Sequence, residues 1–179
     1  MKTSRLLALA VAAPFVLSGC ESIQSVVTKK QPPPCPPVYI LSDASHVTRF
    51  RPGPGRDLTD VELEAEIIGF KGACGYDERG AEVELQVAFE VKRGPAATGR
   101  KAELTYFIAI PKYFPAPEAK AEFTLPVEFP EGMNQARATD ESVVLRIPVK
   151  DRDIITNYEI YLGLQASAEE LEMNRRSKR

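Results

Sequence analysis

Few side chains in this 179-residue chain could do chemistry. His46 is the only histidine, so a zinc site would need carboxylate ligands and an acid–base centre would have to form around this one imidazole. No serine lies in a Gly-x-Ser-x-Gly context, and the turn RPGPGRD lacks the Gly-Lys-Ser/Thr ending of a phosphate-binding loop. The sequence therefore predicts a protein that is not an enzyme and that uses no metal and no cofactor.

Carboxylate pairs at turns are the remaining candidates for a metal site. Asp57 and Asp60 form one pair, and Asp151 and Asp153 form another. Neither pair belongs to the ligand run of an EF-hand loop. Carboxylates at turns usually bond to the nearby backbone, so we expect these residues to shape turns rather than to bind calcium.

The first cysteine, Cys20, ends a segment with the order of a targeting signal. Lys2 and Arg5 come first, and an apolar stretch follows over residues 6–17. This stretch is too short to span a bilayer, which takes about 20 residues. Two small residues, Ser and Gly, then lead into the cysteine.

This order resembles the lipobox of bacterial lipoproteins, here Leu-Ser-Gly-Cys. The resemblance implies that residues 1–19 are a signal peptide that is removed, and that Cys20 receives a diacylglycerol on its thiol and an acyl group on its new amine. Two or more acyl chains anchor a protein stably. Because Glu21 rather than an aspartate follows, the resemblance further implies an outer-membrane protein that faces the periplasm. An ordinary secretory signal with a chance cysteine is the alternative.

Two cysteines, Cys35 and Cys74, remain beside the lipidated one. A lipoprotein lies outside the cytoplasm, where disulfides persist, and one bridge requires an even number of thiols. The midpoint of the pair falls in the chain-reversing turn at residues 51–57. The flanking segments would then fold back as an antiparallel pair, with the two cysteines facing each other at the open end. We predict a Cys35–Cys74 disulfide, with free buried thiols as the alternative.

The elements that must position these residues are strands, because apolar and polar residues alternate along the chain. The clearest run is 83–91, and a first strand is expected within 38–50. Further alternating or apolar runs cover 61–67, 104–110, 123–129, 143–149 and 160–166. Turn signals such as GYDERG and RGPAATGR separate them. The pattern predicts an all-β fold, an immunoglobulin-like β-sandwich of about seven antiparallel strands, with a small β-barrel as the alternative.

The domain organisation follows from these runs. Residues 20–37 are polar and proline-rich and are interpreted as a lipidated tether. Residues 38–166 form the sandwich, and residues 167–179 form a charged C-terminal helix or tail. Ser167 and Glu170 fit a capping box, so we expect a helix of about two turns that frays at its end. We expect the basic end at residues 175–179 to be a solvated tail, with contact to anionic lipid or polymer as the alternative.

Two prolines interrupt alternating runs. Pro126 lies within 123–129 and Pro148 within 143–149. Because proline cannot donate a backbone hydrogen bond to a neighbouring strand, both runs are predicted to be edge strands or to contain a bulge.

Residues 103–114 are apolar on both faces of the expected strand. One interpretation is a central strand whose second face is covered by a loop or by the C-terminal tail. The other is an exposed aromatic surface for a partner, since exposed apolar surface commonly marks an interaction site. The candidate residues of this partner-facing patch are Tyr106, Phe107, Tyr113 and Phe114.

Charge and anchor together define the expected function. Removal of residues 1–19 leaves 21 of the 23 basic residues against 25 acidic ones, a net charge of −4, which argues against nucleic acid as a partner. We expect a lipid-anchored periplasmic structural or interaction protein of the cell envelope, bound to the membrane by its lipid and to an envelope protein. The alternative is a binding protein for a small ligand, glycan or lipid. A flat, exposed face on 103–114 would favour a protein partner, and a cavity would favour the ligand.

Overall fold

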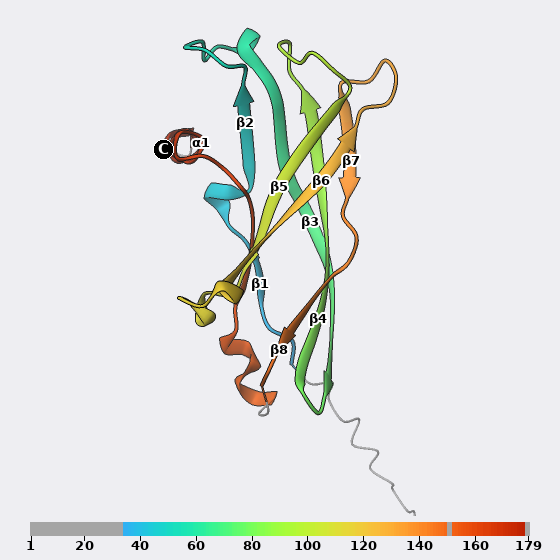
Figure 1. Ribbon diagram of the computed structural model, residues 1–179, viewed down its shortest axis with the longest axis vertical. Coiled ribbons are helices and arrows are strands. Elements are labelled where there is room, and N and C mark those ends of the chain that lie inside the picture. The colour runs from blue at the N-terminus through green and yellow to red at the C-terminus, as the bar shows by residue number, and fades with distance from the viewer. Residues whose placement is uncertain (1–33, 150–151, 178–179) are drawn as a thin grey trace, which may run out of the picture. The chain divides into compact units, whose positions relative to one another are not determined.

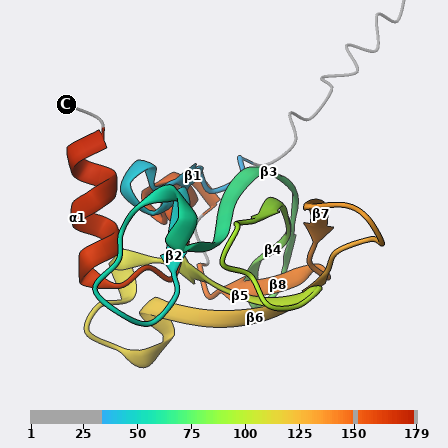
Figure 2. The ribbon, with the colours of Figure 1, turned by 90° about the horizontal axis from the view of Figure 1, so that it is seen from above.

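Two β-sheets face each other in the computed structural model, which describes residues 34–149 and 152–177 (Figure 1, Figure 2). The first sheet has the order β1-β9-β5-β6, with β1 Val38–Ile40, β9 Ile160–Leu164, β5 Lys101–Ala109 and β6 Lys120–Glu128. The second has the order β2-β3-β4-β7, with β2 His46–Phe50, β3 Val61–Asp77, β4 Gly80–Arg93 and β7 Gln135–Thr139, and β8 Val143–Ile147 also pairs with β4. The predicted signal peptide at 1–19 and most of the predicted tether at 20–37 lie outside the described residues.

The predicted all-β sandwich is confirmed, and the strands do not close into the alternative barrel. Its strand count and one pairing differ from the prediction. The described residues form nine strands rather than about seven. The segment 38–50 is not one strand, because the short 3-10 helix η1 (Ser42–Ala44) divides it into β1 in the first sheet and β2 in the second. β1 pairs with β9 in parallel, so the sheets are not wholly antiparallel.

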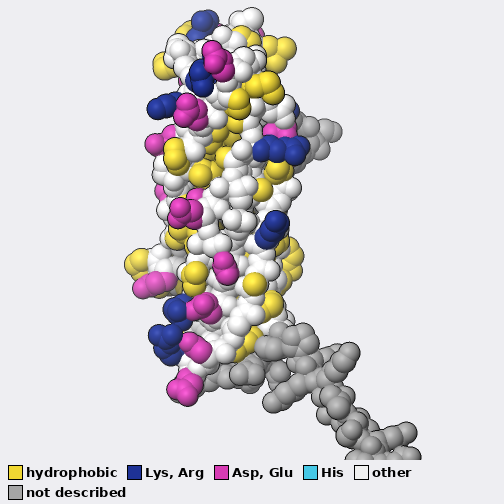
Figure 3. Space-filling view, turned by 90° about the vertical axis from the view of Figure 1, so that its right-hand side faces the viewer, with side chains coloured by type: hydrophobic (Ala, Val, Ile, Leu, Met, Phe, Trp, Pro, Cys, Tyr) yellow, Lys and Arg dark blue, Asp and Glu magenta, His cyan; other side chains and the backbone are white. Residues whose placement is uncertain are grey.

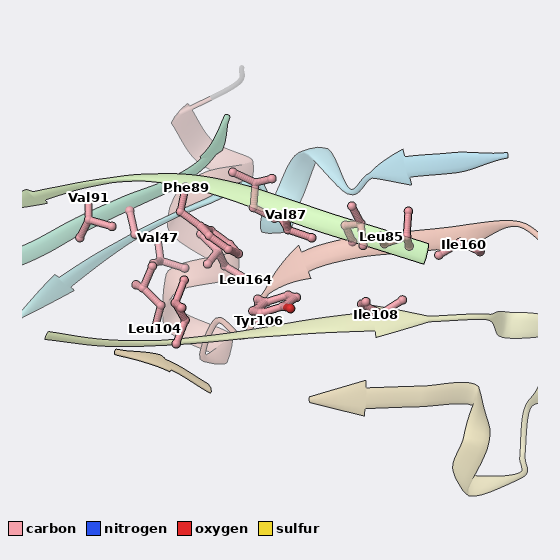
Figure 4. Close-up of a cluster of buried hydrophobic side chains, with 14 of the residues drawn as sticks. Val47, Leu85, Val87, Phe89, Val91, Leu104, Tyr106, Ile108, Ile160 and Leu164 are labelled. Carbon is pink, nitrogen blue, oxygen red and sulfur yellow. The ribbon is translucent and has the colours of Figure 1, made fainter. Parts of the chain in front are cut away.

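The core lies between the sheets and is built from their alternating inward residues. The alternation predicted for 83–91 is confirmed, because every second residue of this run in β4 is buried. β4 pairs with β3 on one side and with β7 and β8 on the other. Figure 4 shows side chains of β2, β4, β5 and β9 pointing toward one another in this core.

A β-bulge between Ile67 and Gly69 changes which residues of β3 face inward. Ahead of the bulge the odd-numbered residues of 61–67 are buried. Beyond it the even-numbered residues stand opposite the buried residues of β4, so that Cys74 lies opposite Val83. A one-residue shift exchanges the two faces of a strand, so the bulge turns Cys74 toward the inside of the sandwich.

The predicted Cys35–Cys74 disulfide is present, with 5.8 Å between the Cα atoms. The turn at 51–57 does join the antiparallel strands β2 and β3. The expected placement of Cys35 on the same strand pair was wrong, because Cys35 precedes β1 of the other sheet. The bridge therefore links the two sheets, and on the chain-entropy model a closed loop of this length stabilises the fold by about 4 kcal/mol.

Both proline-containing runs lie at sheet edges, as predicted. β6, which contains Pro126, is the last strand of the first sheet. β8 pairs only with β4 among the described strands, and Pro148 follows its last residue. Neither proline therefore removes a donor that a neighbouring strand needs.

The C-terminal helix α1 (Ala168–Ser177) begins with the predicted capping box: Glu170 N donates to Ser167 Oγ at 3.2 Å, and Ser167 N donates to the Glu170 carboxylate at 2.6 Å. Beyond this cap the helix docks beside the sandwich (Figure 2). The amide of Asn174, which is 3% exposed, donates to the carbonyls of Asp43 and His46 at 2.9 and 2.7 Å. The helix thus packs against β2 and satisfies the carbonyl of its first residue.

Replacing Asn174 with alanine should lower the free energy of unfolding by about 1–3 kcal/mol, because two carbonyls in a buried place lose their donor. Urea unfolding followed by circular dichroism measures this change. Glu172→Ala, an exposed position on the same helix, is the control and should stay within about 0.5 kcal/mol of the parent. Equal stability of the two variants would show that Asn174 does not hold the helix.

Candidate interaction surface

Tyr106 does not belong to a partner-facing patch, because its side chain is fully buried (Figure 4). Its ring centroid lies 5.1 Å from that of Phe89 and 5.2 Å from that of Phe123. Its hydroxyl donates to Asp140 Oδ2 at 2.6 Å. Burial, together with this carboxylate, raises the pKa of Tyr106 well above its usual value. Because side chains alternate along β5, Tyr106 lies on the same face as the buried Leu104, and its predicted place in the partner-facing patch was wrong.

Phe107 points to the outer face of the first sheet and is half-buried there. It pairs across the strands with Gly163, where a Cβ atom would clash with the phenyl ring, so only glycine lets the ring lie against β9. The ammonium of Lys120 lies 4.7 Å from the ring centroid and also bonds to Glu122 at 2.8 Å. Phe107 is therefore partly covered by the fold itself.

A groove of about 480 Å³ adjoins Phe107 on this face. It runs between η1, α1 and the outer side of β5, with Leu41, Phe107 and Leu171 among its apolar lining residues. Lys120 and Arg175 also line it, and Arg175 is paired with Asp43 at 3.1 Å. The second face of β5 is thus neither fully covered nor flat, and it could receive an apolar group.

Tyr113 and Phe114 lie in the β5–β6 loop, which contains the 3-10 helices η3 (Pro111–Tyr113) and η4 (Pro117–Ala119). Tyr113 is half-buried with its ring centroid 5.7 Å from that of Tyr158, and burial raises its pKa. The side chain of Phe114 is 80% exposed. The four predicted patch residues therefore occupy three environments: the core, the outer sheet face and a loop.

Sequence reasoning missed an aromatic pair on the outer face. The parallel register of β1 and β9 places Tyr39 beside Tyr161, with 5.6 Å between ring centroids. Tyr39 is 46% exposed. The Tyr161 hydroxyl donates to Glu159 at 2.6 Å, and this bond raises the pKa of Tyr161. The tyrosines themselves are visible in the sequence, but their pairing depends on the break at η1.

The acid–base candidates do not come together as a metal site. On the outer face of the second sheet His46 lies opposite Glu66, and Glu66 lies opposite Glu90. Glu90 is already paired with Lys92 at 3.3 Å and Arg137 at 3.5 Å, and these contacts lower its pKa. Within residues 34–149 and 152–177, no group of three or more His, Cys, Asp or Glu side chains could hold a metal ion.

The carboxylates of Asp57 and Asp60 bond to nearby backbone N–H groups and so shape their turn. Asp60 is 4% exposed, pairs with Arg51 and accepts a hydrogen bond from the backbone N–H of Asp57. A Cβ atom at Gly55 would strike the Asp60 carboxylate, so the glycine is required by this close approach. The Asp151/Asp153 pair falls outside the residues whose side chains are described.

The surface carries both signs of charge. On the face shown in Figure 3 acidic, basic and hydrophobic side chains are interspersed, and cross-strand pairs such as Arg146 with Glu82 neutralise one another. No helix in the described part of the chain has both the length and the apolar character needed to cross a bilayer.

Comparisons of the chain with protein-family models, with curated proteins and with solved structures find no match.

The raised pKa of Tyr106 predicts a loss of stability at alkaline pH. In the unfolded chain this phenol ionises near its ordinary value of about 10, whereas the folded protein keeps the proton to higher pH. The stabilisation is therefore complete below pH about 10 and declines as the pH rises further. Tyr106→Phe should make that decline shallower in urea unfolding between about pH 9 and 11. Tyr39→Phe, which removes a hydroxyl from an exposed tyrosine, is the control. If Tyr106→Phe leaves the pH dependence of the unfolding free energy unchanged, other groups cause that dependence.

Proposed function

We propose that this chain is a lipid-anchored interaction protein of the bacterial cell envelope, attached through Cys20 and facing the periplasm from the outer membrane. The basic start, the apolar run and the Leu-Ser-Gly-Cys ending support the anchor. The observation that carries the proposal is the Cys35–Cys74 bridge. Such bridges form and persist outside the cytoplasm and are rare within it, so the bridge fits the address that the anchor implies.

The position of the bridge suits a tethered body. Cys35 lies close to the start of the sandwich, and β1, which follows it, pairs with β9 over only three residues. A pull on the preceding chain would peel so short a strand away. The bridge instead transfers the load to β3, which pairs with β4 over most of its length.

The partner surface that we propose is the outer face of the first sheet, centred on Tyr39, Tyr161 and Phe107. Aromatic residues are enriched where protein interfaces bind most strongly, because their rings offer a large contact area and Tyr adds a polar group. The net charge of −4 after removal of the signal peptide argues against nucleic acid. In this role the protein acts by binding and carries out no catalysis.

A second candidate function, the binding of a small amphipathic ligand, is favoured by the groove beside Phe107. Its volume of about 480 Å³ lies within the usual range of ligand sites, about 300–1,000 Å³. Leu41 and Leu171 would contact an apolar body, while Lys120 and Arg175 would face an anionic group. Both cations already have acidic partners, so a ligand would have to compete with them.

Cys20→Ser tests the anchor. Without the thiol no diacylglycerol can be attached, so the variant should appear as an uncleaved precursor or in the soluble fraction, and it should lose incorporation of labelled fatty acid. Membrane fractionation and labelling measure both effects. Cys35→Ser, which leaves the proposed lipid site intact, is the control and should still be labelled. Unchanged labelling of Cys20→Ser would refute the anchor.

Tyr39→Ala combined with Tyr161→Ala tests the protein partner. In cross-linking and affinity capture from membranes, the loss of one exposed and one half-buried ring should lower recovery of a bound envelope protein by about tenfold or more, since truncating one interface aromatic can cost about 2 kcal/mol. Leu58→Ala removes an apolar side chain that is 80% exposed elsewhere on the molecule and should leave recovery unchanged. If the parent protein brings down no envelope protein but carries a small molecule detected by mass spectrometry, the ligand-binding function replaces this one.

A further inference from the structure

The tip of the β5–β6 loop is an exposed apolar run, Phe114-Pro115-Ala116-Pro117. All four residues are exposed, and Phe114 reaches 80%. Scattered apolar residues are ordinary on protein surfaces. Four in succession at a loop tip are not, because water-facing loops are normally polar.

The backbone of this tip is unusual for a loop in water, because no N–H group in it lacks a partner. Two of its four residues are prolines and have no N–H. The N–H of Phe114 donates to the Pro111 carbonyl at 2.9 Å, and that of Ala116 donates to the Tyr113 carbonyl at 2.8 Å. An apolar medium penalises every unpaired backbone polar group, donors included. The tip could therefore leave water without uncovering a backbone donor.

The loop below the tip is fixed in place. Its ends are closed by a hydrogen bond from Ile110 N to the Ala119 carbonyl at 2.8 Å. Tyr113 packs against Tyr158, and the Lys112 ammonium lies 4.2 Å from the centroid of the same ring. Aromatic rings and lysine side chains are typical of protein segments at the membrane–water boundary. The conformation of the tip is thus fixed by its base, which contains two aromatic rings and a lysine.

The loop lies near the point where the tether joins the sandwich. Tyr158 comes two residues before Ile160, whose N–H donates to the Pro37 carbonyl at 2.9 Å. From Cys20 to Pro34 the chain can extend at most about 50 Å. The loops at the other end of β5, beside Leu58, lie about 30 Å farther along this nine-residue strand. An anchored molecule would therefore find its β5–β6 loop within easy reach of the lipid.

We infer that the tip at residues 114–117 rests in the surface of the membrane that holds the lipid anchor, a conclusion that depends on the proposed anchor at Cys20. The occupant of this surface is lipid rather than protein. Phe114 enters the boundary between headgroups and acyl chains, while Lys112 faces the anionic headgroups. The contact would orient the sandwich, leaving its outer aromatic face beside the membrane and the opposite loops in the periplasm.

The absence of tryptophan from the chain allows a direct test. Phe114→Trp and Leu58→Trp each introduce one fluorophore at a position that is 80% exposed in the parent. Each full-length, processed variant is reconstituted in vesicles of phosphatidylethanolamine and phosphatidylglycerol, with or without bromine-labelled acyl chains. The Phe114→Trp variant should emit at shorter wavelength and lose at least twice as much fluorescence to bromine as the Leu58→Trp variant.

Flotation of the same vesicles separates the two proposals. If both variants float and bromine quenches them equally, the membrane contact is wrong and the anchor stands. If the Phe114→Trp emission shifts without bromine quenching, protein rather than lipid covers the tip, and the inference is overturned. If neither variant floats, the anchor fails and the membrane contact fails with it. Selective quenching in floating vesicles supports both.

Discussion

An extra residue in β3, between Ile67 and Gly69, sets which side chains of the longest strand face inward. In the first half of β3 the odd-numbered side chains face the core. Beyond the extra residue the even-numbered side chains face the same way. Cys74 is one of these, and only this orientation allows it to meet Cys35. The hydroxyl of Tyr76, on the same side, reaches the Pro34 carbonyl at 2.6 Å. The attachment of the N-terminal segment thus depends on a backbone irregularity in a distant strand.

Three edge strands, β2, β6 and β8, have features that discourage backbone pairing with other chains. α1 crosses beside β2, which runs vertically in Figure 1 while the helix is seen end-on, and the Asn174 amide bonds to the carbonyl of His46 at the start of that strand. β6 carries Pro126, and Pro148 follows β8. Covered edges and prolines are the common means of preventing edge-to-edge aggregation. The edges at β2, β6 and β8 are thereby less available for backbone pairing with another chain, which suits a protein whose proposed role is selective binding through side chains.

The alternation of apolar residues predicted β4, β6 and β9 because each buries one face against the other sheet. It could not predict β7, whose sequence QARAT has no large apolar residues and which is held by pairing with β4. Nor could it predict the bulge in β3 or the docking of α1, since both depend on partners far away in the chain. Tyr106 was assigned to the surface because it is aromatic, although its position in the alternation already placed it in the core.

The aromatic residues outside the core divide into those that the fold uses and those that it leaves to solvent. Phe107 covers Gly163, and Tyr113 is packed at the base of its loop, so both contribute to the packing of the first sheet. Tyr39 and Phe114 keep 46% and 80% of their surface exposed. Fully burying a side chain such as Phe stabilises a protein by about 1.5–3 kcal/mol. The isolated fold leaves most of this unused at Phe114 and part of it at Tyr39. A partner or a membrane can still recover it, and both rings lie near the start of β9, whose first residue, Ile160, bonds to the Pro37 carbonyl ahead of β1.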